Sequence, residues 1–163
     1  MEQNPSQNGR NLMFWEHPQS AWAEKADRLL HLMAPGDQDD EEDVDICELV
    51  AARLIEGDTY ELCSIPFLAR NYALGDHVHA PAGQIENVVM PSGRYVYRIF
   101  FSENQEHQPI LEELRDLAEC LFETQGTRLY AIDVASRDLA ILLCNRMGEL
   151  EESGAIVWET GHD

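Results

Sequence analysis

The order of hydrophobic and polar residues divides this chain of 163 residues into three stretches. In the first, the segment 18–33 places apolar residues at helical spacing on one face. These residues are Trp22, Ala26, Leu29, Leu30 and Met33. Pro18 suits a first helical turn, and the Ala-Pro-Gly at 34–36 ends the helix. The pattern therefore predicts an amphipathic helix over 18–33, which docks on the rest of the chain or on a partner protein.

The second stretch, from Val44 to about Ser102, consists of short apolar runs separated by turn residues. Its first two runs, DICELVAARLI and DTYELCSI, are joined by Glu-Gly-Asp, which is typical of a hairpin. Three further runs follow, DHVHAPAG, QIENVVM and RYVYRIFFS. Five short strands at this spacing predict a small, strongly bent β-sheet or an open barrel.

The last third combines helical and strand patterns. The segment 107–124 predicts an amphipathic helix, with Ile110, Leu114, Leu117 and Leu121 inside and carboxylates such as Glu113 and Glu123 outside. The run RLYAIDVA reads as a strand, Ser136 caps a second helix that ends near Gly154, and AIVWET is the final strand. Strand, helix, strand, helix and strand predict crossover connections packed on one sheet. The expected architecture is a single α+β domain over 44–163, preceded by an N-terminal helical extension over 1–43.

The charge of the chain limits its partners. There are 31 acidic residues against 11 basic ones, a formal net charge of −20. Such a chain repels nucleic acid and anionic membranes, and it attracts basic proteins over a long range. The N-terminus has no signal-type apolar stretch, and no apolar run approaches the length of a membrane span. A cytoplasmic protein is therefore expected, with a basic protein as its partner.

An acidic run, PGDQDDEED, covers residues 35–43. A calcium loop of the helix-loop-helix type needs a glycine at its sixth position. Counted from Asp37 the sixth residue is Glu42, and counted from Asp39 it is Val44, so neither register fits. The run therefore indicates a solvated tether over 37–43, and a docking arm for a basic partner is the alternative. The arm would present five carboxylates in sequence, Asp39, Asp40, Glu41, Glu42 and Asp43.

Few residues indicate a chemical reaction. His77 and His79 would share one face of a strand beside Asp76, but they lack further ligands for zinc, so no metal or cofactor is expected. The cysteines have no nucleophile motif around them and are expected to be reduced, buried thiols. They are Cys47, Cys63, Cys120 and Cys144. An enzyme that uses Asp76, His77 and His79 remains a minor alternative.

The segment CSIPFLARNYALGDHVHA, residues 63–80, resembles the bacterial domain-of-unknown-function family DUF4265. The matching residues are Ile65, Pro66, Phe67, Ala69, Arg70, Ala73, Leu74, Gly75, Asp76 and Val78. Ser92 and Gly93 match a later hairpin, where Arg94 replaces the histidine that members tend to have, and Gly161 and His162 match the terminal motif. The resemblance extends over about Cys47 to His162, and it implies membership of a family without an assigned activity.

These observations favour a non-enzymatic acidic binding protein. Its most concrete form is an immunity or antitoxin-like inhibitor that neutralises a basic bacterial toxin, by analogy with other small acidic proteins. Besides the arm, the expected partner-binding residues are Glu112, Asp116 and Glu119 on the helix after His107. A general adaptor or regulatory module, and a mimic of nucleic-acid charge that targets a DNA-binding protein, are the other binding hypotheses.

Overall fold

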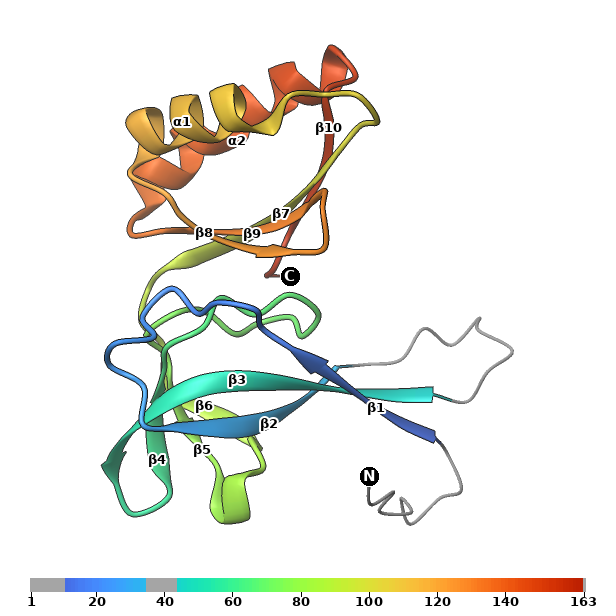
Figure 1. Cartoon of the computed structure of the whole chain (residues 1–163). Helices are drawn as coiled ribbons and strands as arrows, with labels where there is room; N and C mark the ends of the chain where they lie inside the picture. Colours follow the sequence, from blue (N-terminus) through green and yellow to red (C-terminus); the bar gives the residue numbers. More distant parts are fainter. Residues whose placement is uncertain (1–10, 35–43, 163) are drawn as a thin grey trace.

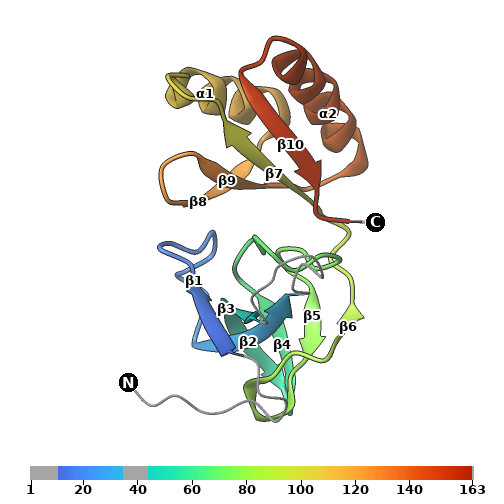
Figure 2. The same cartoon turned by 90° about the vertical axis from the view of Figure 1, so that its right-hand side faces the viewer.

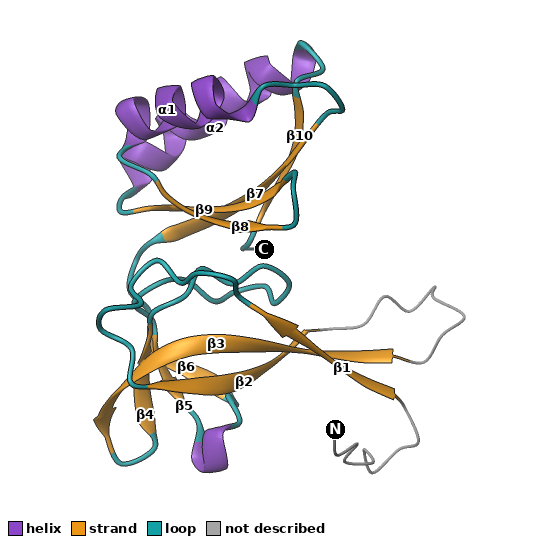
Figure 3. Ribbon diagram, in the orientation of Figure 1, coloured by secondary structure: helices purple, strands orange, loops and turns teal. Residues whose placement is uncertain are grey.

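The computed structural model describes residues 11–34 and 44–162, which form two β-sheets in two halves of the molecule (Figure 1). The first sheet takes its strands from residues 11–90 and the second from residues 95–160. The chain passes from one to the other through the linker 91–94. Both α-helices of the described part of the chain lie in the second half, and the first half has one short 3-10 helix, η1 (Pro81–Gly83) (Figure 3). The predicted α+β class is confirmed.

The first sheet is a strongly curled sheet, which we call the barrel half. Its strands are β1 (Asn11–Glu16), β2 (Arg28–Ala34), β3 (Val44–Glu56), β4 (Thr59–Leu62), β5 (His77–His79) and β6 (Asn87–Met90). The long β3 pairs with β2 in antiparallel register, and with β1 and β4 on its other edge. Strands β4, β5 and β6 continue the sheet. The curl returns to β2, where the amide of Ile85 donates to the carbonyl of His31 at 2.9 Å. This shape agrees with the predicted bent sheet or open barrel, but the last run assigned to it, RYVYRIFFS, forms a strand of the second sheet instead.

The predicted helix over 18–33 is wrong. Residues 21–25 form a turn, and β2 begins at Arg28. In β2, Leu30, Leu32 and Ala34 are buried while the residues between them face outward, which is the period of two of a strand. The positions that match a helix in this short segment fit a strand as well, so periodicity alone does not separate the two. The antiparallel pairing of residues 28–34 with β3 makes this segment a strand.

Strands β1 and β2 both pair with β3, so residues 11–34 belong to the same sheet as residues 44–56. The predicted boundary at residue 43 lies between β2 and β3. The predicted tether over 37–43 lies outside the described residues.

The second sheet with its helices follows the β-α-β-β-α-β order of the ferredoxin-like motif. Its elements are β7 (Tyr95–Phe101), α1 (His107–Ala118), β8 (Leu121–Gln125), β9 (Leu129–Val134), α2 (Arg137–Glu152) and β10 (Ile156–Thr160). The strand order is β10-β7-β9-β8, and all neighbours are antiparallel. Both helices cover the face that points away from the barrel half (Figures 1 and 2). We call α1 and α2 the helical layer, and this half the ferredoxin-like half.

Strand β8, like β1, is an element that the sequence pattern missed. The predicted helix over 107–124 ends at Ala118, because Glu119 adopts a left-handed conformation with φ of 51°. Such a conformation favours glycine, so a glutamate there gives no signal of a helix end in the sequence. The first buried residue of β8 is Glu123, which the helical pattern had placed on a solvated face.

The core is divided in three. One apolar cluster lies between the second sheet and the helical layer, a second inside the barrel half, and a third between the halves. The third includes Ile65, Phe67 and Leu74 from the barrel side, and Val96 and Ala131 from the second sheet. No helix among the described residues is both long enough and apolar enough to cross a lipid bilayer.

Candidate functional site

The segment 63–76, which we call the junction loop, lies where the two halves meet. It contains the motif that carried the family resemblance, and it forms neither helix nor strand. Its apolar side chains Ile65, Phe67 and Leu74 are buried between the halves. Buried backbone without regular structure needs other hydrogen-bond partners for its N–H groups. Carboxylate side chains provide them.

Glu48 of β3 and Glu123 of β8 bind the junction loop from opposite halves. Glu48 accepts hydrogen bonds from the amides of Phe67 at 2.5 Å and Leu68 at 3.1 Å. Glu123 accepts from the amide of Ile65 at 2.8 Å. Both carboxylates are almost fully buried, at 0% and 3% exposure. One loop is therefore held by acceptors from both sheets.

His17 lies between these two carboxylates. Its Nε2 is 2.8 Å from Glu48 Oε1, and its Nδ1 is 2.5 Å from Glu123 Oε2. Burial on its own lowers the pKa of His17, but the hydrogen bonds to Glu123 and Glu48 outweigh it and raise the pKa to about 9. The imidazolium form donates from both ring nitrogens, which suits two carboxylate acceptors. We call His17, Glu48 and Glu123 the charge cluster.

The charge cluster also explains the pKa of Glu48. Burial opposes its ionisation, yet the hydrogen bond and the charge of His17, together with the loop amides, lower its pKa. A buried ion pair that also satisfies hydrogen bonds is costly to break, because one partner is left charged and dry. The cluster therefore fixes the position of β1, β3 and β8 around the junction loop.

Two arginines add further links at the junction. Arg94 forms an ion pair with the buried Asp133 of β9, and its guanidinium lies 5.5 Å from the ring of Trp22. Burial raises the pKa of Asp133, and the hydrogen bond and charge of Arg94 oppose that rise. Arg98 of β7 pairs with Glu159 at 2.9 Å and donates to the carbonyl of Ala69 at 2.7 Å. These contacts join the junction loop to the second sheet.

Gly75 and Asp76 shape the end of the junction loop. Gly75 has φ of 80°, and a Cβ there would lie 3.2 Å from the Trp22 ring, so a larger residue would be strained and crowded. Asp76 is buried, and its carboxylate accepts from the amides of Ala73 at 2.8 Å and Ser92 at 2.7 Å. Asp76 thus ties the junction loop to the linker that leads into β7.

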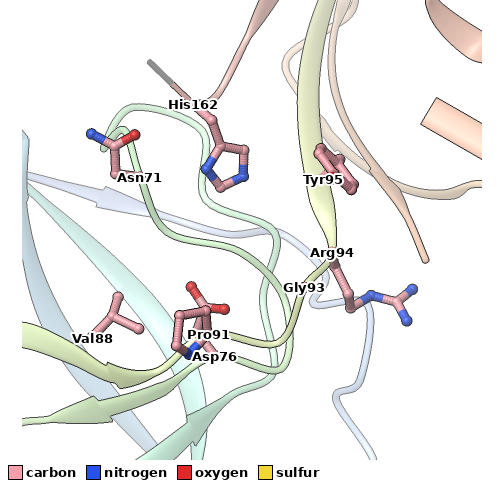
Figure 4. Close-up of a pocket in the computed structure, with 8 residues that line it drawn as sticks. All are labelled: Asn71, Asp76, Val88, Pro91, Gly93, Arg94, Tyr95 and His162. Atoms are coloured by element: carbon pink, nitrogen blue, oxygen red, sulfur yellow. The ribbon is translucent and has the colours of Figure 1, made fainter. Parts of the chain in front are cut away.

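A pocket of about 320 Å³ opens beside Asp76. Its walls come from the junction loop, from β6, from the linker and from the C-terminal segment after β10. The lining residues are Asn71, Asp76, Val88, Pro91, Gly93, Arg94, Tyr95 and His162 (Figure 4). Figure 4 shows the Asp76 carboxylate and the His162 ring directed into the pocket, and the Arg94 side chain leaving it. We call this the junction pocket.

The family-motif residues predicted from the sequence lie in the junction loop or at the junction pocket. Pro66 and Phe67 are buried in the junction loop, and Arg70 is exposed, with its guanidinium 3.9 Å from Glu159. Gly75 and Asp76 end the loop. The pairs Ser92-Gly93 and Gly161-His162, which also matched the family, meet at the junction pocket or next to it. Among the described residues, the junction brings together motif residues that are far apart in the sequence, such as Asp76 and His162, which both line the pocket.

Other predicted residues lie elsewhere. His77 and His79 flank the buried Val78 on β5 and share one face, as predicted, and neither lines the junction pocket. Glu112, Asp116 and Glu119 are exposed on and after α1. The arm residues lie outside the described part of the chain. They are Asp39, Asp40, Glu41, Glu42 and Asp43.

Signals for the charge cluster are weak in the sequence. Glu48 lies among the apolar residues of β3, where alternation indicates burial. Glu123 falls within the predicted helix over 107–124, but α1 ends at Ala118. His17 carried no signal, because its partners are 31 and 106 residues away.

The described residues offer few groups for bond-breaking chemistry. They contain no cluster of three His, Cys, Asp or Glu side chains that could hold a metal ion. Cys47, Cys63 and Cys120 are buried free thiols, and Cys144 is half-buried. Burial raises the pKa of the Cys63 thiol to about 11 and that of Cys120 to about 12. Thiols with raised pKa values are poor nucleophiles at neutral pH.

Comparisons with known proteins agree with the fold. The family model described as "Domain of unknown function (DUF4265)" matches residues 48–158, which lie within the predicted region of resemblance. A hypothetical protein from Neisseria gonorrhoeae has a similar structure, with a TM-score of 0.69 and 14% sequence identity. The match covers 83% of this chain and 94% of that protein, and at this identity it shows the fold alone. No curated protein matches the chain.

Proposed function

Since the chain belongs to the DUF4265 family, whose description assigns no activity, we propose from its surface that it is a non-enzymatic acidic binding protein for a basic protein partner. In its most concrete form it is an immunity or antitoxin-like inhibitor of a basic toxin. The observation that carries the proposal is an apolar strip on the helical layer, bordered by carboxylates.

The strip follows from the register of the two helices. Arg146 of α2 forms an ion pair with Glu113 of α1, with 2.6 Å between Arg146 Nε and Glu113 Oε1. Helices α1 and α2 run antiparallel. Leu117 lies one turn after Glu113 in α1, and Leu142 lies one turn before Arg146 in α2, so the two leucines lie opposite each other. These leucines are 38% and 45% exposed, and the adjacent Ile141 is 51% exposed. We call Leu117, Ile141 and Leu142 the apolar strip.

The helices that carry the apolar strip are acidic on their exposed faces. The two helices carry seven carboxylates and three arginines, and the carboxylates are all exposed. The carboxylates are Glu112, Glu113, Asp116, Asp138, Glu149, Glu151 and Glu152. Arg146 is already paired with Glu113 and Glu149. Glu119, directly after α1, adds another exposed carboxylate. An apolar centre with a charged rim is the usual anatomy of a protein interface.

Charge and apolar contact have different roles in this proposal. The net charge of −20 steers a basic partner toward the protein and raises the association rate. Burial of the apolar strip then slows dissociation, because it removes apolar surface from water. A partner with a cationic cleft or face and apolar side chains within it fits both requirements. A general adaptor with the same surface would bind its target in the same way.

The proposal is tested by crosslinking in the organism that encodes the protein. A photo-crosslinking residue at Leu142 should capture a basic protein, and the yield should fall at high salt. The double variant Glu112→Lys/Asp116→Lys should abolish capture through loss of steering and local repulsion. The matched control places the crosslinker at Val89 of β6, which is 51% exposed in the barrel half.

The proposal fails under either of two results. One is equal capture from Leu142 and Val89. The other is capture from Leu142 that neither salt nor the charge-reversal variant reduces. An adaptor and an inhibitor are then distinguished by whether the captured protein is toxic when produced alone.

A further inference from the structure

The junction pocket has the features of a ligand site that the proposed function does not use. It lies on the barrel side of the second sheet, and the helical layer covers the other face (Figure 1). Its volume of about 320 Å³ lies at the lower end of the range for small-molecule sites, roughly 300–1,000 Å³. It therefore admits one small molecule or one side chain.

The charges at the pocket favour a cation. The Asp76 carboxylate points into the pocket (Figure 4), and each of its oxygens accepts one backbone N–H. A carboxylate has about four acceptor positions, so Asp76 can accept further hydrogen bonds. Arg94 is the lone arginine or lysine among the lining residues of the described chain, and its guanidinium is bound to Asp133 outside the pocket. An anion would thus meet a carboxylate without a compensating arginine.

The remaining walls suit the alkyl part of such a cation. Val88 and Pro91 present apolar surface to the pocket. At Gly93, with φ of 78°, a Cβ would meet no other heavy atom within 4 Å, so the backbone there borders open space.

We propose that the junction pocket binds a small organic cation, an alkyl guanidinium or alkyl ammonium group. The charge lies on Asp76, and the alkyl part lies against Val88 and Pro91. Because the walls come from both halves of the molecule, the ligand also bridges the halves. This site does not depend on the binding function proposed for the helical layer.

The test follows the backbone amide signals of the full chain by NMR during titration. The probes are methylguanidinium and its neutral isostere methylurea, with n-butylammonium and butyrate as a second pair of opposite charge. We expect the cations to shift the amides of Asn71 and Gly93 and to bind about tenfold more tightly than their counterparts, because charge-assisted hydrogen bonds are the stronger ones. Equal binding of methylguanidinium and methylurea, or shifts that avoid the pocket, would overturn the proposal.

Two variants assign the interaction to its residues. Asp76→Asn should abolish the preference for the cation, and the matched control Glu86→Gln removes an exposed carboxylate outside the lining of the pocket. Asp76 also holds the junction loop, so a disordered Asp76→Asn protein is replaced by Val88→Ala, which removes part of the apolar wall and leaves Asp76 in place. Val88→Ala should weaken the binding of n-butylammonium several-fold. Unchanged cation affinity in a folded Asp76→Asn or Val88→Ala protein contradicts the site.

A last pair of probes separates two sources of the cation. Argininamide represents a free small molecule, and the peptide Gly-Arg-Gly represents an arginine side chain of another protein. Tighter binding of the peptide assigns the pocket to a protein side chain, and exclusion of the peptide assigns it to a free small molecule. Failure of both to bind contradicts the proposed ligand class.

Discussion

The helical layer and the junction are held by different forces. Below the helical layer, apolar side chains such as Leu114, Leu143 and Met147 pack on the sheet, and the charged residues of the helices face solvent. At the junction, charged side chains are buried, and they bind a loop without regular structure. Carboxylates in this acidic chain therefore lie in two environments. Those at the junction bind backbone amides inside the fold, and those on the helices are exposed to solvent.

The largest expected effect comes from removing residues 1–43. The deletion takes away β1 and β2, two buried leucines of the barrel core and His17 of the charge cluster. The sequence pattern alone predicts that residues 44–163 fold as a domain, but the strand pairing predicts that they do not. We expect no cooperative thermal transition for 44–163, measured by circular dichroism. A cooperative transition close to that of the full chain would mean that β1 and β2 contribute little.

The second prediction compares one carboxylate from each region. Glu123→Ala removes one of the two carboxylates bound to the buried His17 and leaves the amides of Ala21 and Ile65 without their acceptor, so it should destabilise the protein by about 3–5 kcal/mol. Glu113→Ala removes a surface ion pair with Arg146 and should cost at most about 1 kcal/mol. Urea unfolding of both variants measures the difference. Similar losses for the two would remove the distinction between the regions.

The third prediction concerns pH. The pKa of His17 is raised from 6.5 to about 9 in the folded protein. The stabilisation of the folded protein by the His17 imidazolium is therefore complete below pH 6.5 and is lost as the pH rises through about 9. The free energy of unfolding should fall by about 3 kcal/mol over this window, as about 1.4 kcal/mol corresponds to one pKa unit.

The variant His17→Gln provides the control for this window. It lacks the titrating imidazole, so its stability should be lower at neutral pH and nearly flat between pH 6.5 and 9. The buried thiols of Cys63 and Cys120 add an alkaline loss of their own, but it begins near their ordinary pKa of 9.0. A wild-type stability that does not change between pH 6.5 and 9 would mean that His17 is not held as an imidazolium.

The smallest expected effect lies in the helical layer. Ser136 caps α2, and its hydroxyl accepts from the amide of Leu139 at 3.4 Å, as the sequence predicted. Ser136→Ala should destabilise the protein by about 1 kcal/mol, and Ser136→Asp should restore most of the loss. Thermal unfolding measures both. A loss as large as that of Glu123→Ala would show that the helices depend on more than their packing.

The same contrast explains which parts of the fold the sequence could predict. Helix α2 has a cap, a buried stripe and a glycine after its end, so local signals agree with the final structure. The predictions for β2 and for the end of α1 were wrong. A short apolar segment fits the period of a helix as well as that of a strand, and Glu119 gives no signal that the helix ends there. Pairing with β3 decided the structure of β2, and pairing with β9 decided that of the segment after α1.

The candidate site shows the same limit. The motif between Ile65 and Asp76 stood out as a string of letters, and the structure places it at the junction of the two halves. Its carboxylate partners could not be found from the sequence, because Glu123 is 58 residues from Ile65. Carboxylates that the sequence pattern places in solvent are buried in the structure, because the fold brings backbone amides to them as hydrogen-bond donors.

The central functional claim is that acidic residues recruit a basic partner and that the helical layer retains it. Stopped-flow binding to the protein captured from Leu142, at low and at physiological salt, tests it most directly. Replacement of Asp39, Asp40, Glu41, Glu42 and Asp43 by their amides should slow association about tenfold at low salt and leave dissociation nearly unchanged. Replacing Glu112, Asp116 and Glu119 by their amides should instead speed dissociation. An association rate that responds neither to salt nor to these charges would contradict the account.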